Sequence, residues 1–376
     1  MNKTIRTTTL LLMTILASCS KNDSEDDYTP IPTTPVSVDL NTIPYQKLTS
    51  YNFFQGDLKE LSPNSRVLPY EPSSTLFSDY AHKKRFVWMP ENKKATYNAD
   101  NKVLELPIGS VLIKNFYYNN TQPSNTKKII ETRVMIRKES GWIFANYVWN
   151  DTQTEAILDL GGSTKNITWI DDNSVTRTVN YRIPNESQCI VCHKSNTIVG
   201  GQPTTIHTPI GIKPQSLNFE YNYGSNSKNQ LLKWQEVGYL ANNFALPTAA
   251  NTAVNYNDAT KPLESRVRAY FDINCAHCHN ENGHCSYRPM RFDFNSTQGA
   301  NGLTNMGVCV DTQDMQGFPS ELNKIIAPRR TDRSMLFYRI NTTDEAYMMP
   351  LHGRSLIHTE GIQLIEQWIN TLDFCN

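Results

Sequence analysis

The chain has 376 residues, which is enough for about two or three domains. Of these residues 39% are hydrophobic and 10% aromatic, which is enough for packed cores. Lys plus Arg and Asp plus Glu both number 36, which gives a formal net charge of zero. This balance lacks the basic footprint of a nucleic-acid-binding protein, and we expect no nucleic-acid partner.

The first eighteen residues have the pattern of an export signal. Lys3 and Arg6 precede an apolar stretch at 10–16, which is too short to span a bilayer. The stretch ends in Leu16-Ala17-Ser18-Cys19, which resembles the lipobox of bacterial lipoproteins; the alternative is an ordinary cysteine after a signal peptide. We therefore expect a signal peptide at 1–18, a lipid on Cys19, and a lipid-anchored protein of the bacterial cell envelope. Its expected place is the outer membrane, on the periplasmic or the surface face.

Residues 19–44 are predicted to form a flexible tether. An acidic run at 20–27 is followed by Pro- and Thr-rich sequence without the apolar content to fold. The acidic run also resembles the signal that sends some lipoproteins to the outer face of the outer membrane, and a plain solvated linker explains it equally well.

A β-rich domain is predicted at 45–185. Its strand-like runs are separated by turn residues and lie at 102–109, 110–117, 128–137, 142–149, 155–160 and 166–170. In the third run, Ile130, Thr132, Val134 and Ile136 alternate on one face. This pattern indicates an antiparallel sandwich or barrel. The strand aromatics Trp142, Tyr147, Trp149 and Trp169 are interpreted as core residues rather than a ligand platform.

Cys189-Ile190-Val191-Cys192-His193 is a Cys-x-x-Cys-His run, the attachment signature of c-type haem. Its two thiols can each bond one vinyl group, and His193 would then be an axial ligand of the iron. We assign 186–227 as the first haem-binding segment. The ligand opposite His193 is left open between His207, Met89, His82, another methionine and a vacant position.

The signature recurs at Cys275-Ala276-His277-Cys278-His279, within a predicted cytochrome c-like domain at 228–376. A chance match is expected on the order of 10⁻⁵ per position, so two accidental matches are excluded. Pro262 opens a predicted helix at 263–273 that leads directly into Cys275. A last helix at 359–369, with Thr359 as N-cap, would pack against it. A third amphipathic helix is predicted at 228–237, ending before Gly238.

Met349 is the predicted sixth ligand of the second iron. It lies in the run Met348-Met349-Pro350, seventy residues after His279 and before the last helix. A thioether favours reduced iron, and the following proline stiffens the loop that presents it. Met348 is the reserve ligand, and a methionine that only fills a core gap is the alternative.

Three cysteines remain outside the motifs: Cys285, Cys309 and Cys375. An exported chain favours one disulfide among them. Cys285–Cys309 is the nearest pair in sequence, but all three pairings stay open.

These motifs resemble those of the exported di-haem c-type cytochromes found beside sugar-dehydrogenase-like and parallel β-helix proteins in bacterial gene neighbourhoods. The resemblance spans roughly 76–369 and includes 76–81, 85–88, 106–109, 131–133, 147–150, 188–193, 274–280, 348–350 and 353–356. It implies two covalent haems, an N-terminal β domain, a C-terminal cytochrome c domain and a redox partner such as a sugar dehydrogenase.

The leading functional hypothesis is electron transfer, because His279 and Met349 would leave the second iron without an open position. The runner-up is a haem enzyme, peroxidase-like or dehydrogenase-associated, with an open first site. A thiolate-bound zinc protein is the third hypothesis, which two separate Cys-x-x-Cys-His runs in an exported chain disfavour.

Overall fold

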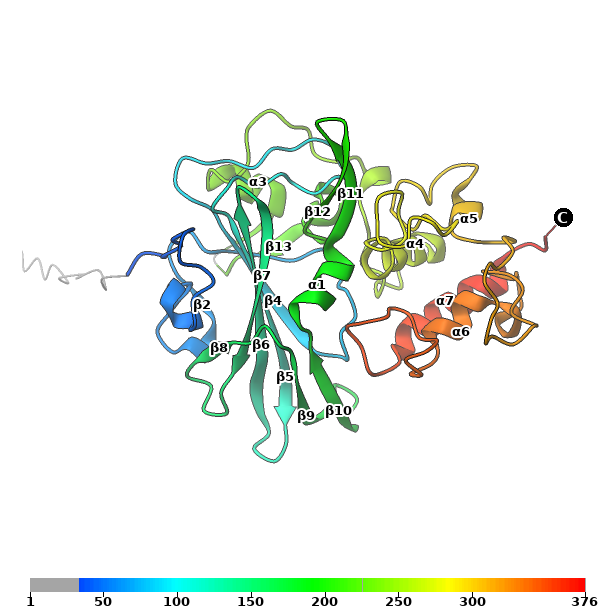
Figure 1. The fold of residues 1–376 in the computed structure, drawn as a ribbon, viewed down its shortest axis with the longest axis horizontal. Coiled ribbons are helices and arrows are strands. Elements are labelled where there is room, and N and C mark those ends of the chain that lie inside the picture. Colours follow the sequence, from blue (N-terminus) through cyan, green and yellow to red (C-terminus); the bar gives the residue numbers. More distant parts are fainter. Residues whose placement is uncertain (1–33, 225, 376) are drawn as a thin grey trace, which may run out of the picture. The chain divides into compact units, whose positions relative to one another are not determined.

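The structure is a computed structural model that describes residues 34–224 and 226–375 (Figure 1). The predicted signal peptide, the lipidated Cys19 and the first part of the tether lie outside the described residues. Within the described ranges, no helix is both long and apolar enough to span a membrane.

An eight-stranded antiparallel sheet dominates the N-terminal half (Figure 1). Its long central strands β5, β6 and β7 pair in sequence order, and β8 pairs with β7. On the other side of β5, β4 pairs along 111–117 and carries β3, while the β9–β10 hairpin meets β5 at Thr121. The strands are β3 (Leu68–Tyr70), β4 (His82–Trp88), β5 (Val111–Thr121), β6 (Thr126–Lys138), β7 (Gly141–Trp149), β8 (Ala156–Leu158), β9 (Ser163–Ile170) and β10 (Thr176–Ile183).

The predicted antiparallel β region is therefore confirmed, but its eight strands hydrogen-bond into one sheet rather than two stacked ones. In the described chain, no ladder joins β8 to β3 or β10, so the sheet is open at these edges. The predicted strand at 102–109 is wrong. There Glu105 makes only an isolated bridge to Thr96, the Leu104 N–H donates to the Ile212 carbonyl, and Pro107 has no N–H to offer a ladder.

A bulge in β6 changes the predicted face of one residue. The register shifts between Phe116 and Tyr117, so that Tyr117 pairs with Ile129 and Phe116 with Glu131. Ile129 therefore packs with Val134 in one core, while Ile130 packs with Phe116 in another. The predicted single face for Ile130 and Val134 is wrong, because the extra residue of a bulge breaks the two-residue period.

The strand aromatics Trp142, Tyr147, Trp149 and Trp169 are all buried, which confirms their interpretation as core. Short elements precede the sheet: η1 (Leu48–Tyr51), β1 (Phe54–Gln55), η2 (Leu58–Glu60) and β2 (Ser62–Pro63). η1 contributes Leu48 and Tyr51 to the same core as Tyr147 and Trp149. The Tyr51 and Tyr147 hydroxyls are hydrogen-bonded at 2.9 Å.

The segment that follows β10 contains several short helices and hairpins. Helix α1 leads into a hairpin of β11 and β12, and further short elements end at α3. These elements are α1 (Glu186–His193), β11 (Lys194–Val199), β12 (Gln202–His207), α2 (Pro214–Leu217), β13 (Glu220–Asn222), β14 (Ser227–Asn229), α3 (Gln230–Glu236) and η3 (Ala249–Asn251). Gly238 follows α3 with a φ of 78°, as a residue after a helix end should.

The C-terminal region contains several helices: α4 (Leu263–Asn274), α5 (Gly302–Asn305), η4 (Thr331–Arg333), α6 (Met335–Ile340) and α7 (Thr359–Thr371). α7 packs against both α4 and α6 (Figure 1). The predicted pairing of the helix before Cys275 with the last helix is thus confirmed, with Phe271 and Trp368 in edge contact. Thr359 is the first residue of α7 rather than its N-cap; His358 holds that position without a side-chain cap bond.

The disulfide joins Cys309 to Cys375, with 5.6 Å between their Cα atoms. Cys285, of the nearest pair in sequence, is buried and unpaired. The bond ties the end of the chain back to the segment before α6.

Candidate functional site

Helix α1 presents the first Cys-x-x-Cys-His motif. A capping box begins the helix: the Asn185 side chain accepts from the Gln188 N–H at 3.0 Å, and the Gln188 side chain accepts from the Asn185 N–H at 3.1 Å. Cys189 and Cys192 are three residues apart in this helix and therefore share one face. The Asn146 side chain from β7 lies 4.0 Å from the Cys189 sulfur.

His193 is the last residue of α1, and its ring has the orientation and charge that metal binding requires. Its Nδ1 lies 2.7 Å from the Thr208 carbonyl, which fixes Nδ1 as the donor and leaves Nε2 free. Burial lowers the pKa of His193 to about 4, so the ring is neutral near pH 7. A neutral, oriented imidazole is the form that coordinates iron.

The second motif continues directly from α4. The Asn274 side chain accepts from the Phe77 N–H at 2.8 Å and donates to the Tyr270 carbonyl at 3.0 Å. The His279 N–H donates to the Cys275 carbonyl at 3.0 Å, so the chain keeps turning through the motif. The His279 ring is 8% exposed, and burial lowers its pKa to about 4.

The two motifs meet in the structure. The donor atoms of Cys192, His277 and Cys278 all lie within 4.8 Å of one another, and the Cys278 sulfur is 3.9 Å from the Val191 carbonyl. Burial and hydrogen bonding to Cys192 raise the pKa of Cys278. Two thiols and an imidazole at this separation are also a possible ligand set for a soft metal such as zinc, with a fourth position left to fill.

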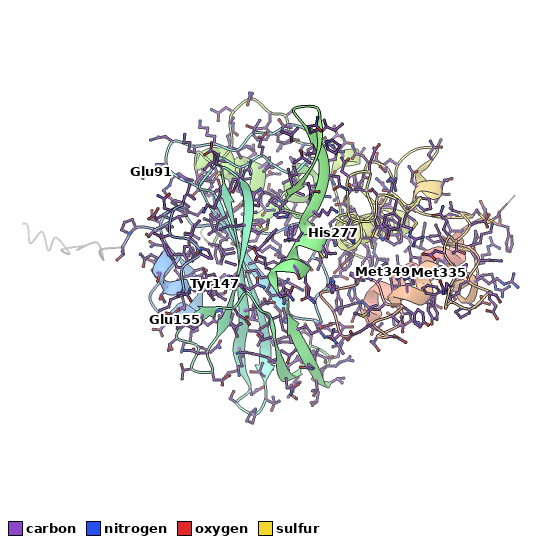
Figure 2. All side chains as sticks on the ribbon, viewed as in Figure 1. Glu91, Tyr147, Glu155, His277, Met335 and Met349 are labelled. Carbon is purple, nitrogen blue, oxygen red and sulfur yellow. A yellow bond between two sulfur atoms is a disulfide. The ribbon has the colours of Figure 1, made fainter. Side chains whose placement is uncertain are left out.

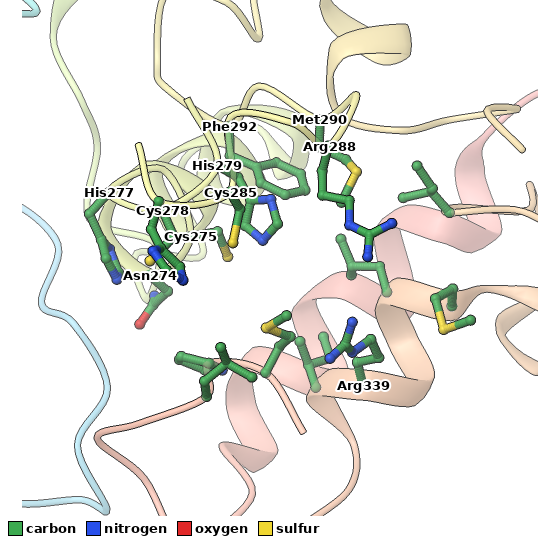
Figure 3. Close-up of a pocket in the computed structure, with 18 of the residues that line it drawn as sticks. Asn274, Cys275, His277, Cys278, His279, Cys285, Arg288, Met290, Phe292 and Arg339 are labelled. Carbon is green, nitrogen blue, oxygen red and sulfur yellow. The ribbon is translucent and has the colours of Figure 1, made fainter. Parts of the chain in front are cut away.

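A cavity of about 450 Å³ opens beside the second motif (Figure 3). Cys275, Cys278 and His279 line one wall, and Met349 is among the residues that close the cavity. Arg339 of α6 lies across the cavity from His279 in Figure 3. The volume falls within the range of about 300–1,000 Å³ that holds most cofactors.

Met348 and Met349 have different surroundings. Met348 is 3% exposed and does not line the cavity, whereas Met349 does. The structure therefore brings the predicted ligand, and not its reserve, to the cavity that contains His279.

Arg354 organises the Met349 loop and was not identified from the sequence. It is 4% exposed and donates to backbone carbonyls throughout the loop, including Met349 at 2.9 Å and Thr342 at 2.8 Å. The Asp79 carboxylate, just before β4, accepts from the Ser355 and Leu356 N–H groups at 2.7 and 2.8 Å. No local pattern marks an arginine that binds carbonyls, so only the fold reveals this role.

A second cavity of about 160 Å³ lies beside the first motif. Cys189, Cys192 and His193 line it opposite one face of the sheet, which contributes Lys114 and Phe144. Its volume is below the usual cofactor range, so the side chains around it would have to move apart for a large group.

The named candidates for the ligand opposite His193 do not reach this cavity. His207 Nδ1 is 3.2 Å from the Trp142 carbonyl, Met89 is buried in a core without lining the cavity, and His82 stacks on Tyr117. The imidazole and thioether side chains that do line it, besides His193, are Met135, His277 and His352. Figure 2 places His277 near α1. Met135 is the methionine in this set, His352 was not named from the sequence, and the vacant position stays open.

The donor chemistry fits covalent haem at both motifs. Each has two thiols and a neutral histidine, and the buried Nδ1 of His279 has no hydrogen-bond partner among the described residues. At the second motif a thioether also lines the cavity. Comparisons of the chain with family models, curated proteins and solved structures found no match in any of the three. The function is therefore inferred from these residues and their geometry.

Proposed function

We propose that the chain is a di-haem c-type cytochrome of the cell envelope that passes electrons to or from a partner oxidoreductase. The observation that supports this most is that two complete Cys-x-x-Cys-His motifs meet, while each lines its own cavity. Bound haem would supply the one-electron chemistry of iron.

Four cysteines would hold the two groups: Cys189 and Cys192 at the first motif, Cys275 and Cys278 at the second. Each thiol adds across a vinyl group, so that sulfur bonds to one carbon and the proton goes to the other. No oxidant is consumed. The burial that raises the pKa of Cys189 and Cys275, the latter to about 12, keeps both thiols protonated until that addition.

The second motif has the ligand set of an electron carrier. His279 would supply an imidazole nitrogen and Met349 a thioether, which together leave no position for substrate. Met349 is held by its own N–H, which donates to the Arg339 carbonyl at 2.8 Å, and by the bond from Arg354 to its carbonyl. A ligand whose backbone is held in this way changes position little when the iron is oxidised or reduced, and a small rearrangement favours outer-sphere electron transfer.

The contact between the motifs supports their acting as a pair. Cys192 and Cys278 would each bear one edge of a haem, and their sulfurs are within 4.8 Å of each other. This separation of the attachment points supports electron exchange between the two groups that the cysteines would hold. The partner, which the resemblance suggests is a sugar dehydrogenase, and the lipid anchor at Cys19 belong to the same proposal.

Mass spectrometry of protein made with a c-type maturation system tests the proposal. We expect two haems per chain, and one after Cys189→Ser with Cys192→Ser or after Cys275→Ser with Cys278→Ser. A chain without haem that instead binds one zinc, and loses it in His277→Ala, would replace this function with the metal site of Cys192, His277 and Cys278.

A haem enzyme remains the alternative. It is favoured because none of the described residues opposite His193 is held by backbone hydrogen bonds in the way that Met349 is held at the second motif, so the first iron could have an open position. Carbon monoxide added to the reduced protein distinguishes the two functions. An electron carrier with both irons saturated leaves the spectrum unchanged, whereas binding at one haem would favour the enzyme.

A further inference from the structure

Three cations stand directly opposite one another on the sheet face that lines the first motif's cavity. Arg85 on β4 pairs with Lys114 on β5, and Lys114 pairs with Arg133 on β6. We call Arg85, Lys114 and Arg133 the cation row. Like charges in directly opposed positions repel and destabilise a sheet. All three side chains line the cavity, and Arg85 is only 6% exposed.

The carboxylates near the row neutralise only part of it. Arg133 is bound by both oxygens of Glu131, at 2.6 and 3.0 Å. The Arg85 guanidinium lies 3.5 Å from Glu71, whose side chain is 43% exposed. Such a half-exposed, long contact contributes little.

No carboxylate binds Lys114 directly. Across the described ranges its ammonium makes no hydrogen bond or ion pair; it lies 4.6 Å from the centroid of the Phe116 ring, and the charge of Glu131 acts on it only from a distance. Burial and the positive charges of Arg85 and Arg133 hold the pKa of Lys114 well below its usual range. Burying a cation without a partner is costly, and a bound anion would offset that cost.

An apolar row lies beside the cation row on the same face. Leu112, Met135 and Phe144 pair across β5, β6 and β7, two residues along each strand from the cations or Asn146, and all three line the cavity. The cation row itself continues from Arg133 to Asn146, whose side chain reaches the Cys189 sulfur. This wall suits a flat apolar group with carboxylates at one edge.

We propose that Arg85, Lys114 and Arg133 form a carboxylate-binding site for the propionates of a haem attached at Cys189 and Cys192. The inference rests on the function proposed above. Its chemistry, carboxylates bound by a buried cation row, would also accept a free dicarboxylate such as succinate. Each of Lys114 and Arg133 alternates with apolar residues along its own strand, which is visible in the sequence. Only the structure shows that the two residues pair across the strands.

The test compares Lys114→Met with Lys127→Met, an exposed lysine on the neighbouring β6, in the full di-haem protein. A further pair carries Cys275→Ser and Cys278→Ser, so that only the first haem is observed. Loss of a cation beside the propionates stabilises oxidised iron. We expect Lys114→Met to shift the redox equilibrium about tenfold toward oxidation, roughly 59 mV for one electron. Lys127→Met should leave the potential unchanged, and Lys114→Arg should restore it, which separates a charge effect from misfolding.

Each outcome decides the inference. If the first haem has the same redox potential in the wild type and in Lys114→Met, the carboxylate site is overturned while the di-haem function stands. If the chain holds no haem, succinate is the probe. Thermal stabilisation by succinate that Lys114→Met abolishes would support the carboxylate site with a free acid as its ligand and overturn the haem function. No haem and no succinate effect would overturn both.

Discussion

Met348 and Met349 are adjacent methionines with separable roles, and replacing each by alanine separates them. Met349 lines the cavity that contains His279, while Met348 is buried and does not line it. We expect Met349→Ala to abolish the long-wavelength absorption band of methionine-bound ferric haem. Met348→Ala should keep that band, because its side chain does not reach the cavity.

The effects on stability should run the other way. Met348 is 3% exposed, and truncating a methionine so fully buried costs about 2–5 kcal/mol of unfolding free energy. Met349 is only half-buried, so the same truncation should cost roughly 1 kcal/mol where no haem is bound. Urea unfolding in the Cys275→Ser, Cys278→Ser background measures both costs in a protein to which no second haem can be attached. The reasoning is refuted if Met348→Ala loses the absorption band while Met349→Ala retains it, or if the order of the two stability losses is reversed.

Three further predictions follow from buried or cross-linked groups. Cys309→Ser should lower the unfolding free energy by about 4 kcal/mol, because the disulfide with Cys375 closes a loop of 66 residues; urea unfolding with and without reductant measures this. Burial lowers the pKa of Lys83 to about 7, so the unfolded chain binds more protons than the folded chain between about pH 7 and 10.4. Stability should therefore rise with pH across that window, by at most about 1.4 kcal/mol per unit, and Lys83→Met should flatten the rise. His352 lines the first cavity and His207 does not, so if the first iron takes its second ligand from His352, His352→Ala opens that iron to carbon monoxide and His207→Ala does not.

Each of these has a clear contrary result. Equal stability of the oxidised and reduced wild-type chains would contradict the disulfide prediction. A stability that falls between pH 7 and 10 in the wild type, or rises as steeply in Lys83→Met, would contradict the assignment of the low pKa to Lys83. Carbon monoxide binding in the wild type would show that His352 does not ligate the first iron, and Met135→Ala is the matched comparison.

The features that were predictable from the sequence are local. The helix before Cys275 was predictable because its apolar spacing, its opening proline and its motif lie within about twenty residues. Strands β5 to β7 were predictable for the same reason, since alternation is a property of neighbours. The bulge that turns Ile130 away from Val134 was not, because it depends on how Phe116 and Tyr117 pair across the ladder.

The site depends on contacts between distant positions, which local patterns do not report. That Cys192 would lie beside Cys278 required the fold, although each motif was evident. The pairing of Cys309 with Cys375 was likewise one of three equal choices. The cation row was hidden because Lys114 and Arg133, taken singly, are ordinary strand lysine and arginine residues.

The bond between the Asp79 carboxylate and the backbone of Ser355 and Leu356 has a consequence for the modularity of the protein. Burial raises the pKa of Asp79. The two N–H groups that donate hydrogen bonds to its carboxylate lie 276 and 277 residues away in sequence, in the loop that presents Met349. A fragment that begins after the sheet would lack this anchor. The helical region is therefore not a self-sufficient cytochrome that could be cut out or transplanted. Its methionine loop takes its shape partly from the segment before β4, so a substitution at Asp79 should alter the position of Met349.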